Sequence, residues 1–279
     1  MPQSSISDTS TRPATAIRSR NNARWKDFRQ RLLHPARSSD GKVAIEGIHL
    51  VQEALRSGLR LQTLFLREDA AKNLADFPAD EIYVVEKNIF NQGCATEAPQ
   101  GVAALVQPPT AILDTMLRGN NSLLVILDGI QDPGNLGTIL RSAEAFGASG
   151  VLMLPGTVNP WNQKAMRASA GSVFRVPLVQ LADIDALAHL RAQKISIYAA
   201  VAQDGIDAAK ISLDGPTALL IGNEGAGISA AALAFAEKKI QIDCPGPVES
   251  LNAGVAASIL LYAAAQQRRI VSPAKGKQR

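Results

Sequence analysis

Residues 123–127 read LLVIL, and this run constrains the fold more than any other segment of the chain. A strand made only of apolar residues is buried on both faces, which is typical of a parallel sheet covered by helices on both sides. Strand-like and helix-like segments alternate after it, so the sequence predicts an α/β domain with a mainly parallel sheet over residues 121–270. The expected strands are residues 151–154, 195–201, 218–221 and 240–242, and the expected helices are residues 136–146, 181–193 and 250–267.

A smaller α/β unit precedes this domain, and Pro108-Pro109 marks its end. Its expected strands are residues 43–45, 61–66, 82–85 and 102–106, with helices over residues 48–57 and 69–75. The start of the chain is rich in Ser, Thr, Arg and Pro, a composition typical of a flexible tail. We therefore expect a basic flexible tail with a short helix over residues 1–40, a small α/β domain over 41–108, a linker over 109–120, the sheet domain over 121–270 and a basic tail over 271–279.

The net charge of +4 is unevenly distributed along the chain. Residues 1–37 carry +6 and residues 268–279 carry +5, which leaves −7 on the residues between them. Basic ends on an acidic body favour a nucleic-acid partner, because cationic arms release counterions from a polyanion. The alternative is that the terminal charges only keep the chain soluble.

A short helix is expected over residues 21–33, because the apolar residues there recur at helical spacing. These apolar residues are Trp25, Phe28, Leu32 and Leu33. Arg24 and Arg31 fall together beside this stripe. They either offer a basic ridge to RNA phosphates or are simply a solvated face of the helix.

The cysteine and histidine counts exclude several classes of protein. The two cysteines, Cys94 and Cys244, form neither a disulfide framework nor a metal motif, and they fit a reducing compartment such as the cytoplasm. The three histidines are scattered, so we expect no metal site. The longest nearly apolar run, residues 253–265, is shorter than the ~20 residues that span a bilayer, so we expect no membrane segment.

Three loops that follow expected strands are dense in Gly, Pro and small polar residues: residues 127–141, 220–229 and 242–252. Ligands of parallel α/β sheets bind where strand ends pass into loops, so we expect the chemistry there. The first strand is followed by no G-x-G-x-x-G motif, and the chain has no G-x-x-x-x-G-K-[ST] phosphate loop. None of the three loops contains histidine, and Ser250 lies in no G-x-S-x-G elbow, which disfavours a Ser-His-Asp hydrolase.

The three loops carry three motifs in order: Asn135-x-Gly137-x-x-x-Arg141, Gly222-Asn-Glu-Gly225, and Glu249-Ser-Leu-Asn252 followed by an apolar helix. Over residues 121–265 this set resembles the SpoU/TrmH branch of the SPOUT methyltransferases. Arg167-Ala-Ser-Ala-Gly171 is similar to a further segment of that family. Residues 42–107, with Glu46-Gly47 and Pro99-Gln-Gly-Val-Ala103, resemble the L30e-like RNA-binding domain of the same family.

The resemblance implies an enzyme that transfers a methyl group from S-adenosylmethionine to a ribose 2′-hydroxyl of RNA without a metal. It also implies a trefoil knot in the C-terminal sheet domain and a homodimer. The last expected helix fits a dimer, because the chain has no charged residue between Glu249 and Arg268. Much of that helix should be buried against the sheet or against a second subunit.

The resemblance assigns roles to individual residues. Arg141 would contact the target phosphate and aid deprotonation of the 2′-hydroxyl. Because a guanidinium holds its proton firmly, we favour stabilisation of the developing alkoxide over action as a general base. The residues expected to position Arg141, the ribose and the methyl donor are Asn135, Glu224, Ser250 and Asn252. Glu224 could instead only tie two loops together. The residues that match the methyl-donor site are Gly222, Ile242 and Leu251, with Ile221 and Gly246 close by.

The chain departs from the family pattern at two places. Ile242-Asp243-Cys244 stands where the family usually has Ile-Pro-Met, and Asn252-Ala253-Gly254 stands where it usually has Asn-Val-Ser. Backbone contacts tolerate such changes better than side-chain contacts, so the departures bear on methyl-donor affinity and not on the fold. The L30e-like domain favours ribosomal RNA of the large subunit (23S) as substrate. The alternatives are tRNA, methylation of a base, or a non-catalytic RNA-binding or ribosome-assembly factor with the same fold.

Overall fold

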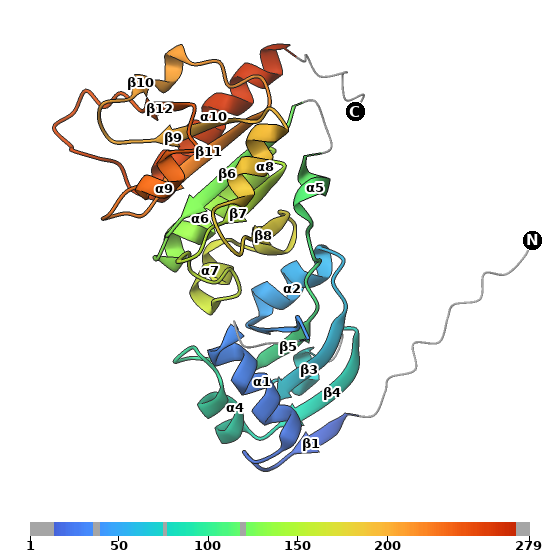
Figure 1. Cartoon of the computed structure of the whole chain (residues 1–279). Coiled ribbons are helices and arrows are strands. Elements are labelled where there is room, and N and C mark those ends of the chain that lie inside the picture. Colours follow the sequence, from blue (N-terminus) through green and yellow to red (C-terminus); the bar gives the residue numbers. More distant parts are fainter. Residues whose placement is uncertain (1–13, 36–39, 75–76, 118–120, 272–279) are drawn as a thin grey trace, which may run out of the picture. The chain divides into compact units, whose positions relative to one another are not determined.

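The computed structural model describes residues 14–35, 40–74, 77–117 and 121–271. The chain divides into two compact units, Met1–Pro108 and Pro109–Arg279 (Figure 1). None of the described helices is long and apolar enough to cross a membrane.

The N-terminal unit is a five-stranded mixed sheet with helices, in the strand order β1-β4-β3-β5-β2. Strands β1 and β3 run parallel to β4, whereas β5 is antiparallel to both β3 and β2. The strands are β1 (Thr15–Ile17), β2 (Val43–Glu46), β3 (Leu61–Arg67), β4 (Ala79–Val85) and β5 (Val102–Val106). The helices are α1 (Ala23–Leu33), α2 (Ile48–Arg56), α3 (Ala71–Leu74) and α4 (Lys87–Gly93).

The expectation that residues 1–40 form only a flexible tail with a helix is wrong for the part that the structure describes. Strand β1 pairs with β4, and its Ile17 is buried. Helix α1 is confirmed, with Asn22 as N-cap, and it places Trp25 and Phe28 in the core of the same unit. Two rings of this core stack, since the Trp25 and Phe28 centroids are 5.0 Å apart. Burial of this apolar surface fixes the segment to the sheet; residues 1–13 and 36–39 lie outside the described residues.

The C-terminal unit holds a seven-stranded sheet in the order β10-β12-β9-β11-β6-β7-β8, and every pairing in it is parallel. The expectation of a parallel sheet is thus confirmed, and the LLVIL run lies in its middle as β6. The strands are β6 (Leu123–Asp128), β7 (Gly150–Met153), β8 (Leu178–Gln180), β9 (Ser196–Ala200), β10 (Ile206–Asp207), β11 (Thr217–Gly222) and β12 (Lys238–Gln241). The helices are α5 (Leu113–Met116), α6 (Pro133–Ala145), α7 (Gln163–Ala168), α8 (Ala186–Ala192), α9 (Ala230–Leu233) and α10 (Ala253–Val271).

Helices cover both faces of this sheet. Alternate β6 residues, Leu124 and Ile126, belong to the core that α5, α8 and α9 complete. Helix α10 packs on β11 and on α6, and α6 packs in turn on α7. A hydrogen bond between two hydroxyls links α6 and α10, because Ser142 Oγ and Ser258 Oγ are 2.6 Å apart. The same arrangement leaves the carboxyl ends of the parallel strands open to the loops.

The expected linker over residues 109–120 is instead part of the C-terminal unit where the structure describes it. Helix α5 places Met116 in the core, and the Met116 carbonyl accepts a 3.2 Å hydrogen bond from Ser122 Oγ. Met116 packs so closely on β7 that a Cβ at Gly150 would lie 2.5 Å from its sulfur. The apolar side chains of this short segment bury against the sheet, and the sequence pattern was too brief to reveal it. Residues 118–120 and the expected C-terminal tail after Val271 lie outside the described residues.

Candidate active site

The first and second motif loops meet at the carboxyl ends of β6 and β11. Asn135 Nδ2 donates a 2.6 Å hydrogen bond to Glu224 Oε1. Beside this contact, Asn223 Nδ2 donates to the Gly129 carbonyl at 2.7 Å. Because β6 and β11 pair along their whole length, with Asp128 opposite Gly222, their loops leave the sheet side by side. The structure thus brings two predicted site residues, Asn135 and Glu224, into direct contact.

The first loop passes directly into α6. Asp132 is the N-cap and Pro133 follows it at the first helical position, as the sequence predicts. The Asp132 carboxylate accepts a hydrogen bond from the Asn135 backbone N–H and pairs with Lys164 on α7. The Asn135 N–H, with the Lys164 ammonium as a smaller cause, holds the pKa of Asp132 below its ordinary value. This cap fixes the helix start and with it the position of Asn135.

The second loop is a compact turn that depends on a glycine. Asn223 and Gly227 exchange backbone hydrogen bonds, and Asn223 Oδ1 accepts from the backbone N–H groups of Gly225 and Ala226. A Cβ at Gly222 would lie 2.4 Å from the Gly227 carbonyl carbon and 2.4 Å from the Ile228 nitrogen. Only glycine therefore allows the end of β11 to approach the far side of its own turn.

A cavity of about 530 Å³ lies between this turn, the end of β9 and the loop after β12. Its volume falls in the range of ~300–1,000 Å³ that small-molecule sites occupy. Six of the predicted site residues line it: Ile221, Gly222, Glu224, Ile242, Ser250 and Leu251. Gly246 is not among the lining residues, although its loop neighbours Cys244 and Val248 are.

The walls of this cavity combine apolar and acidic side chains. Ile221, Ile240 and Leu260 are almost fully buried beneath it. Its charged lining residues are all carboxylates, Glu224, Asp243 and Glu249, and its lining includes no lysine, arginine or histidine. Such a site suits a ligand with an apolar ring and a positive charge.

Asn252 and Arg141 lie outside the lining of the cavity. Asn252 Oδ1 accepts hydrogen bonds from the backbone N–H groups of Gly254 and Val255, so its side chain is occupied in starting α10. Arg141 is exposed and makes no hydrogen bond or ion pair with any described residue. It lies six positions after Asn135 on α6, which at 3.6 residues per turn places it about 120° around the helix axis. Arg141 is therefore separate from the Asn135–Glu224 contact within this chain.

The sequence prediction missed two residues that build the site, Asp128 and Asn223. Asp128 Oδ2 accepts a 2.7 Å hydrogen bond from the Ser229 N–H, which ties the first loop to the end of the second. Asn223 holds both its own turn and Gly129. Each residue ends an apolar strand or directly follows one, and that position in a parallel sheet was the available signal.

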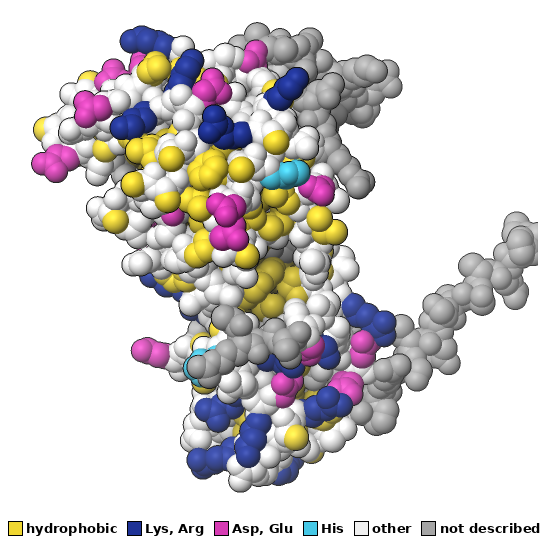
Figure 2. Space-filling view, in the orientation of Figure 1, with side chains coloured by type: hydrophobic (Ala, Val, Ile, Leu, Met, Phe, Trp, Pro, Cys, Tyr) yellow, Lys and Arg dark blue, Asp and Glu magenta, His cyan; other side chains and the backbone are white. Residues whose placement is uncertain are grey.

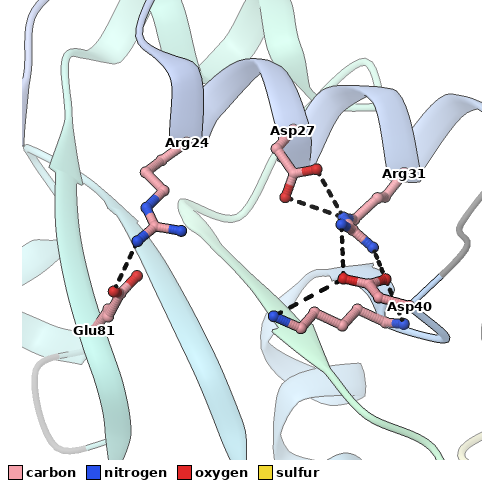
Figure 3. Close-up of polar contacts among 6 residues, drawn as sticks. Arg24, Asp27, Arg31, Asp40 and Glu81 are labelled. Atoms are coloured by element: carbon pink, nitrogen blue, oxygen red, sulfur yellow. Dashed lines mark hydrogen bonds and ion pairs between the residues drawn. The ribbon is translucent and has the colours of Figure 1, made fainter.

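The two arginines predicted to bind RNA lie in the N-terminal unit and have carboxylate partners (Figure 3). Arg24 Nη2 is 3.0 Å from Glu81 Oε1 on β4. Arg31 pairs with Asp27 one turn earlier and with Asp40, and its hydrogen bond with Asp40 is the main cause of its raised pKa. The Arg31 side chain is only 15% exposed, whereas that of Arg24 is 58% exposed. Arg31 thus clamps α1 in place, and Arg24 is the more accessible of the two.

The surface of the N-terminal unit carries many charges of both signs. On the face in Figure 2, lysine and arginine side chains are numerous over this unit and are interspersed with aspartate and glutamate. Among the residues that the structure describes, no group of three or more His, Cys, Asp or Glu side chains could hold a metal ion.

Two family profiles match the chain and together cover both units. Residues 122–262 match the SpoU rRNA Methylase family. Residues 22–104 match the MRM3-like substrate binding domain. The chain belongs to the SpoU rRNA methylase family. The second match begins at Asn22, which agrees with the structure in placing α1 within the N-terminal domain and not in a tail.

Relatives of this SpoU-family chain match nearly its whole length. The 23S rRNA (guanosine(2553)-2′-O)-methyltransferase RlmP of Bacillus subtilis is 32% identical over 88% of this chain and 97% of its own length. A 23S rRNA (uridine(2479)-2′-O)-methyltransferase of Streptomyces viridochromogenes is 32% identical over 92% of this chain and 94% of its own length. The crystal structure of the SpoU methyltransferase AviRb from that organism, in complex with AdoMet, has a TM-score of 0.79 at 29% identity and covers 90% of this chain and 99% of its own.

The cavity of this SpoU-family chain fits S-adenosylmethionine. Its apolar walls suit the flat adenine ring, and its carboxylates suit a ligand that carries a sulfonium and an ammonium group. The glycine turn at Gly222 also keeps backbone groups on the cavity wall, where they can read an adenine edge without side chains. The fold, the cavity chemistry and the AdoMet-bound relative therefore agree.

Proposed function

We propose that this protein transfers a methyl group from S-adenosylmethionine to a ribose 2′-hydroxyl in 23S rRNA, in the cytoplasm. The observation that carries the proposal is the Asn135–Glu224 hydrogen bond, which joins two family motifs beside a cavity lined by carboxylates. The names of the two relatives support 23S rRNA and the 2′-hydroxyl as targets. The two names give a guanosine and a uridine as the target, so the target nucleotide differs between the relatives.

The methyl donor would lie in the cavity against Ile221, Gly222, Ile242 and Leu251. When bound, S-adenosylmethionine supplies an electrophilic methyl group on a positively charged sulfur. The protein's part is to hold that methyl group in line with the attacking oxygen, since a displacement of this kind depends on orientation. Gly246, which the sequence also assigns to this site, stays a prediction.

The Asn135–Glu224 contact would position the ribose. Glu224 lines the cavity while its Oε1 accepts from Asn135, so one carboxylate faces the methyl donor and also holds the first motif loop. This geometry supports both roles that the sequence leaves open for Glu224. Ser250 lines the same cavity from the third loop, where it would contact the ribose or the methyl donor. Asn252 acts through the start of α10, which it caps.

Arg141 would act on the RNA and not on the methyl donor. It is exposed and has no described carboxylate partner, so its charge is available to a phosphate or to an alkoxide. Its contribution would be electrostatic stabilisation of the 2′-oxygen, which forms a bond to the methyl carbon as the sulfur–methyl bond breaks and the hydroxyl proton passes to water.

A homodimer is part of the proposal. Helix α10 buries one side on the sheet, but Val255, Ile259 and Tyr262 on its other side are 45%, 40% and 52% exposed. These residues follow one helical stripe, and Phe146 contacts Tyr262 edge-on to extend it. A contiguous apolar stripe of this kind marks an interaction site, and a second copy of the chain is the partner that the resemblance implies. The trefoil knot that the resemblance implies also belongs to this proposal.

Ribose-methylation mapping of rRNA from a strain that lacks the gene tests the proposal. We expect one ribose-methylated position of 23S rRNA to be lost and to return with the wild-type gene but not with Arg141→Ala. Isothermal titration should show that Arg141→Ala binds S-adenosylmethionine about as well as wild type, because Arg141 does not line the cavity. A lost methyl group on a base or on tRNA would refute the substrate assignment. Full restoration by Arg141→Ala would refute the role of that arginine.

A further inference from the structure

The segment between β6 and β8 is basic on an otherwise acidic body. Residues 129–177 contain four cationic side chains and two carboxylates, whereas the chain between its basic ends carries −7. The structure pairs both carboxylates, Asp132 with Lys164 and Glu144 with Arg175. Arg141 and Arg167 are thus the two cations of this segment that have no carboxylate partner within it.

Arg167 is exposed on α7, one residue before Ala168, which packs on Gly137 of α6. Lys164 and Arg167 are three positions apart on this helix and share one exposed face. The Lys164 ammonium reaches the N-cap of α6, because its nitrogen is 3.3 Å from Asp132 Oδ2. Arg167 therefore lies one turn further along the same face, next to the helix that carries Asn135.

The helices that carry Arg167 and Arg141 pack closely on each other. A Cβ at Gly137 would lie 2.4 Å from the Ala168 Cβ and 2.8 Å from its carbonyl carbon, so α7 touches α6 at the residue after Arg167. Arg141 is one turn beyond Gly137, a rise of about 6 Å at 1.5 Å per residue. Arg141 and Arg167 therefore lie on neighbouring turns of two closely packed helices.

The turn after Arg167 holds this arrangement rigidly. Ser169 is fully buried, and its Oγ donates a 2.8 Å hydrogen bond to the Met166 carbonyl. Ala170 has φ 49° and Gly171 has φ 87°, which places a non-glycine residue in the left-handed region. Such backbone persists where the surrounding packing determines it, and it is frequent at ligand-binding sites. Here it follows the end of α7 at Ala168 and leaves Arg167 in the last turn of the helix.

We propose that Arg167 binds a phosphate of the substrate RNA adjacent to the target nucleotide, beside the phosphate that Arg141 contacts. The proposal rests on the proposed function for the role of Arg141 and goes beyond it in naming a second anchor for the strand. A guanidinium held on a rigid helix end loses little entropy when it forms charge-assisted hydrogen bonds to phosphate oxygens. Two anchors on one strand also fix the direction in which the strand crosses the site, which one anchor does not do.

The test compares Arg167→Ala, Arg167→Lys and a matched control, Arg191→Ala, in the full chain. Arg191 also lies exposed in the last turn of a short helix, but α8 covers the sheet face opposite α6 and α7. Each variant is assayed with an unmethylated 23S rRNA transcript and tritiated S-adenosylmethionine, and its RNA affinity is measured by filter binding at several salt concentrations. Isothermal titration and thermal unfolding follow methyl-donor binding and stability.

We expect Arg167→Ala to raise the KM for RNA about 10-fold or more, as loss of a charged hydrogen bond requires, with a smaller change in kcat. The salt dependence of RNA binding should fall by about 0.7 in log–log slope, the contribution of one phosphate on a single strand. Arg167→Lys should restore part of the affinity, and Arg191→Ala should match wild type.

An Arg167→Ala variant with wild-type KM and salt slope would overturn the proposal. Equal losses of methyl-donor affinity, stability and RNA affinity would also overturn it, because they would indicate a structural role. Failure of the wild-type protein to methylate any RNA would instead refute the proposed function. The salt slope would then still decide whether Arg167 contacts RNA.

Discussion

Replacement of Gly222 by alanine tests whether the turn after β11 shapes the methyl-donor cavity. The added Cβ would lie 2.4 Å from the Gly227 carbonyl carbon and from the Ile228 nitrogen, and 2.6 Å from the Gly227 oxygen. Ordinary contacts between heavy atoms are about 3.5–4.0 Å long, so the turn must move by about 1 Å or more. All three obstructing atoms belong to the backbone, so no side-chain rotation relieves the clash.

The size of the effect follows from what the turn touches. Gly227 and Ile228 line the cavity together with Gly222, so a shift of the turn changes the wall of the proposed methyl-donor site. A misplacement of about 1 Å can lower the rate of an oriented reaction roughly 100-fold. We expect the Kd for S-adenosylmethionine to rise about 10- to 100-fold by isothermal titration. Overpacking should lower the free energy of unfolding by about 1–3 kcal/mol, which scanning calorimetry detects as a lower Tm.

Gly225→Ala is the matched control for this variant. Gly225 lines the same cavity from the same turn, but its added Cβ would meet nothing closer than Asn223 Oδ1 at 3.7 Å, an ordinary contact. We expect its Kd for the methyl donor to stay within about 3-fold of wild type. Wild-type affinity in Gly222→Ala, or an equal loss in Gly225→Ala, would refute the argument that the clash at position 222 displaces the wall of the methyl-donor site.

Two further predictions concern the acceptor side and the dimer. Asn135→Asp replaces the amide that donates to Glu224 with a second carboxylate, and the repulsion should open the contact between the two loops. We expect tritium transfer to RNA to fall about 100-fold with little change in methyl-donor affinity, and normal transfer would contradict the positioning role. Ile259→Glu places a charge in the exposed apolar stripe of α10. Light scattering after gel filtration should then report a monomer that has lost methyl transfer, and an unchanged mass would argue against this face as the interface.

The long elements of the fold could be predicted because their side-chain pattern alone determines them. Strands β6 and β11 are continuous apolar runs, and α6 carries both a cap and an apolar stripe. The short elements depend on partners that are distant in sequence. Strand β1 has three residues and exists through its pairing with β4, and α5 exists because Met116 packs on Gly150. Neither contact leaves a local signal in the sequence.

The candidate site shows the same division between local pattern and tertiary contact. The motifs predicted that Glu224 and Asn135 act together, and the structure places them 2.6 Å apart. The motifs grouped Arg141 with these residues, whereas the helix geometry places Arg141 on another side of α6. The residues of a motif indicate which side chains act in one reaction. The motif does not indicate whether those side chains lie close together within one chain, because that depends on how helices and subunits pack.

Both departures from the family pattern place a residue in the cavity wall, since Ala253 of the second departure lines it as well. Asp243 and Cys244 both line the cavity, so they belong to the wall of the proposed methyl-donor site and not to a remote loop. Asp243 adds a carboxylate where the family usually has proline, in a cavity whose other charged residues are Glu224 and Glu249. The methyl donor is cationic before transfer and its sulfur is neutral afterwards, so an added negative charge favours the donor over the demethylated product. We therefore expect Asp243 to strengthen the electrostatic fit of the proposed site to S-adenosylmethionine, because a proline at this position would supply no charge.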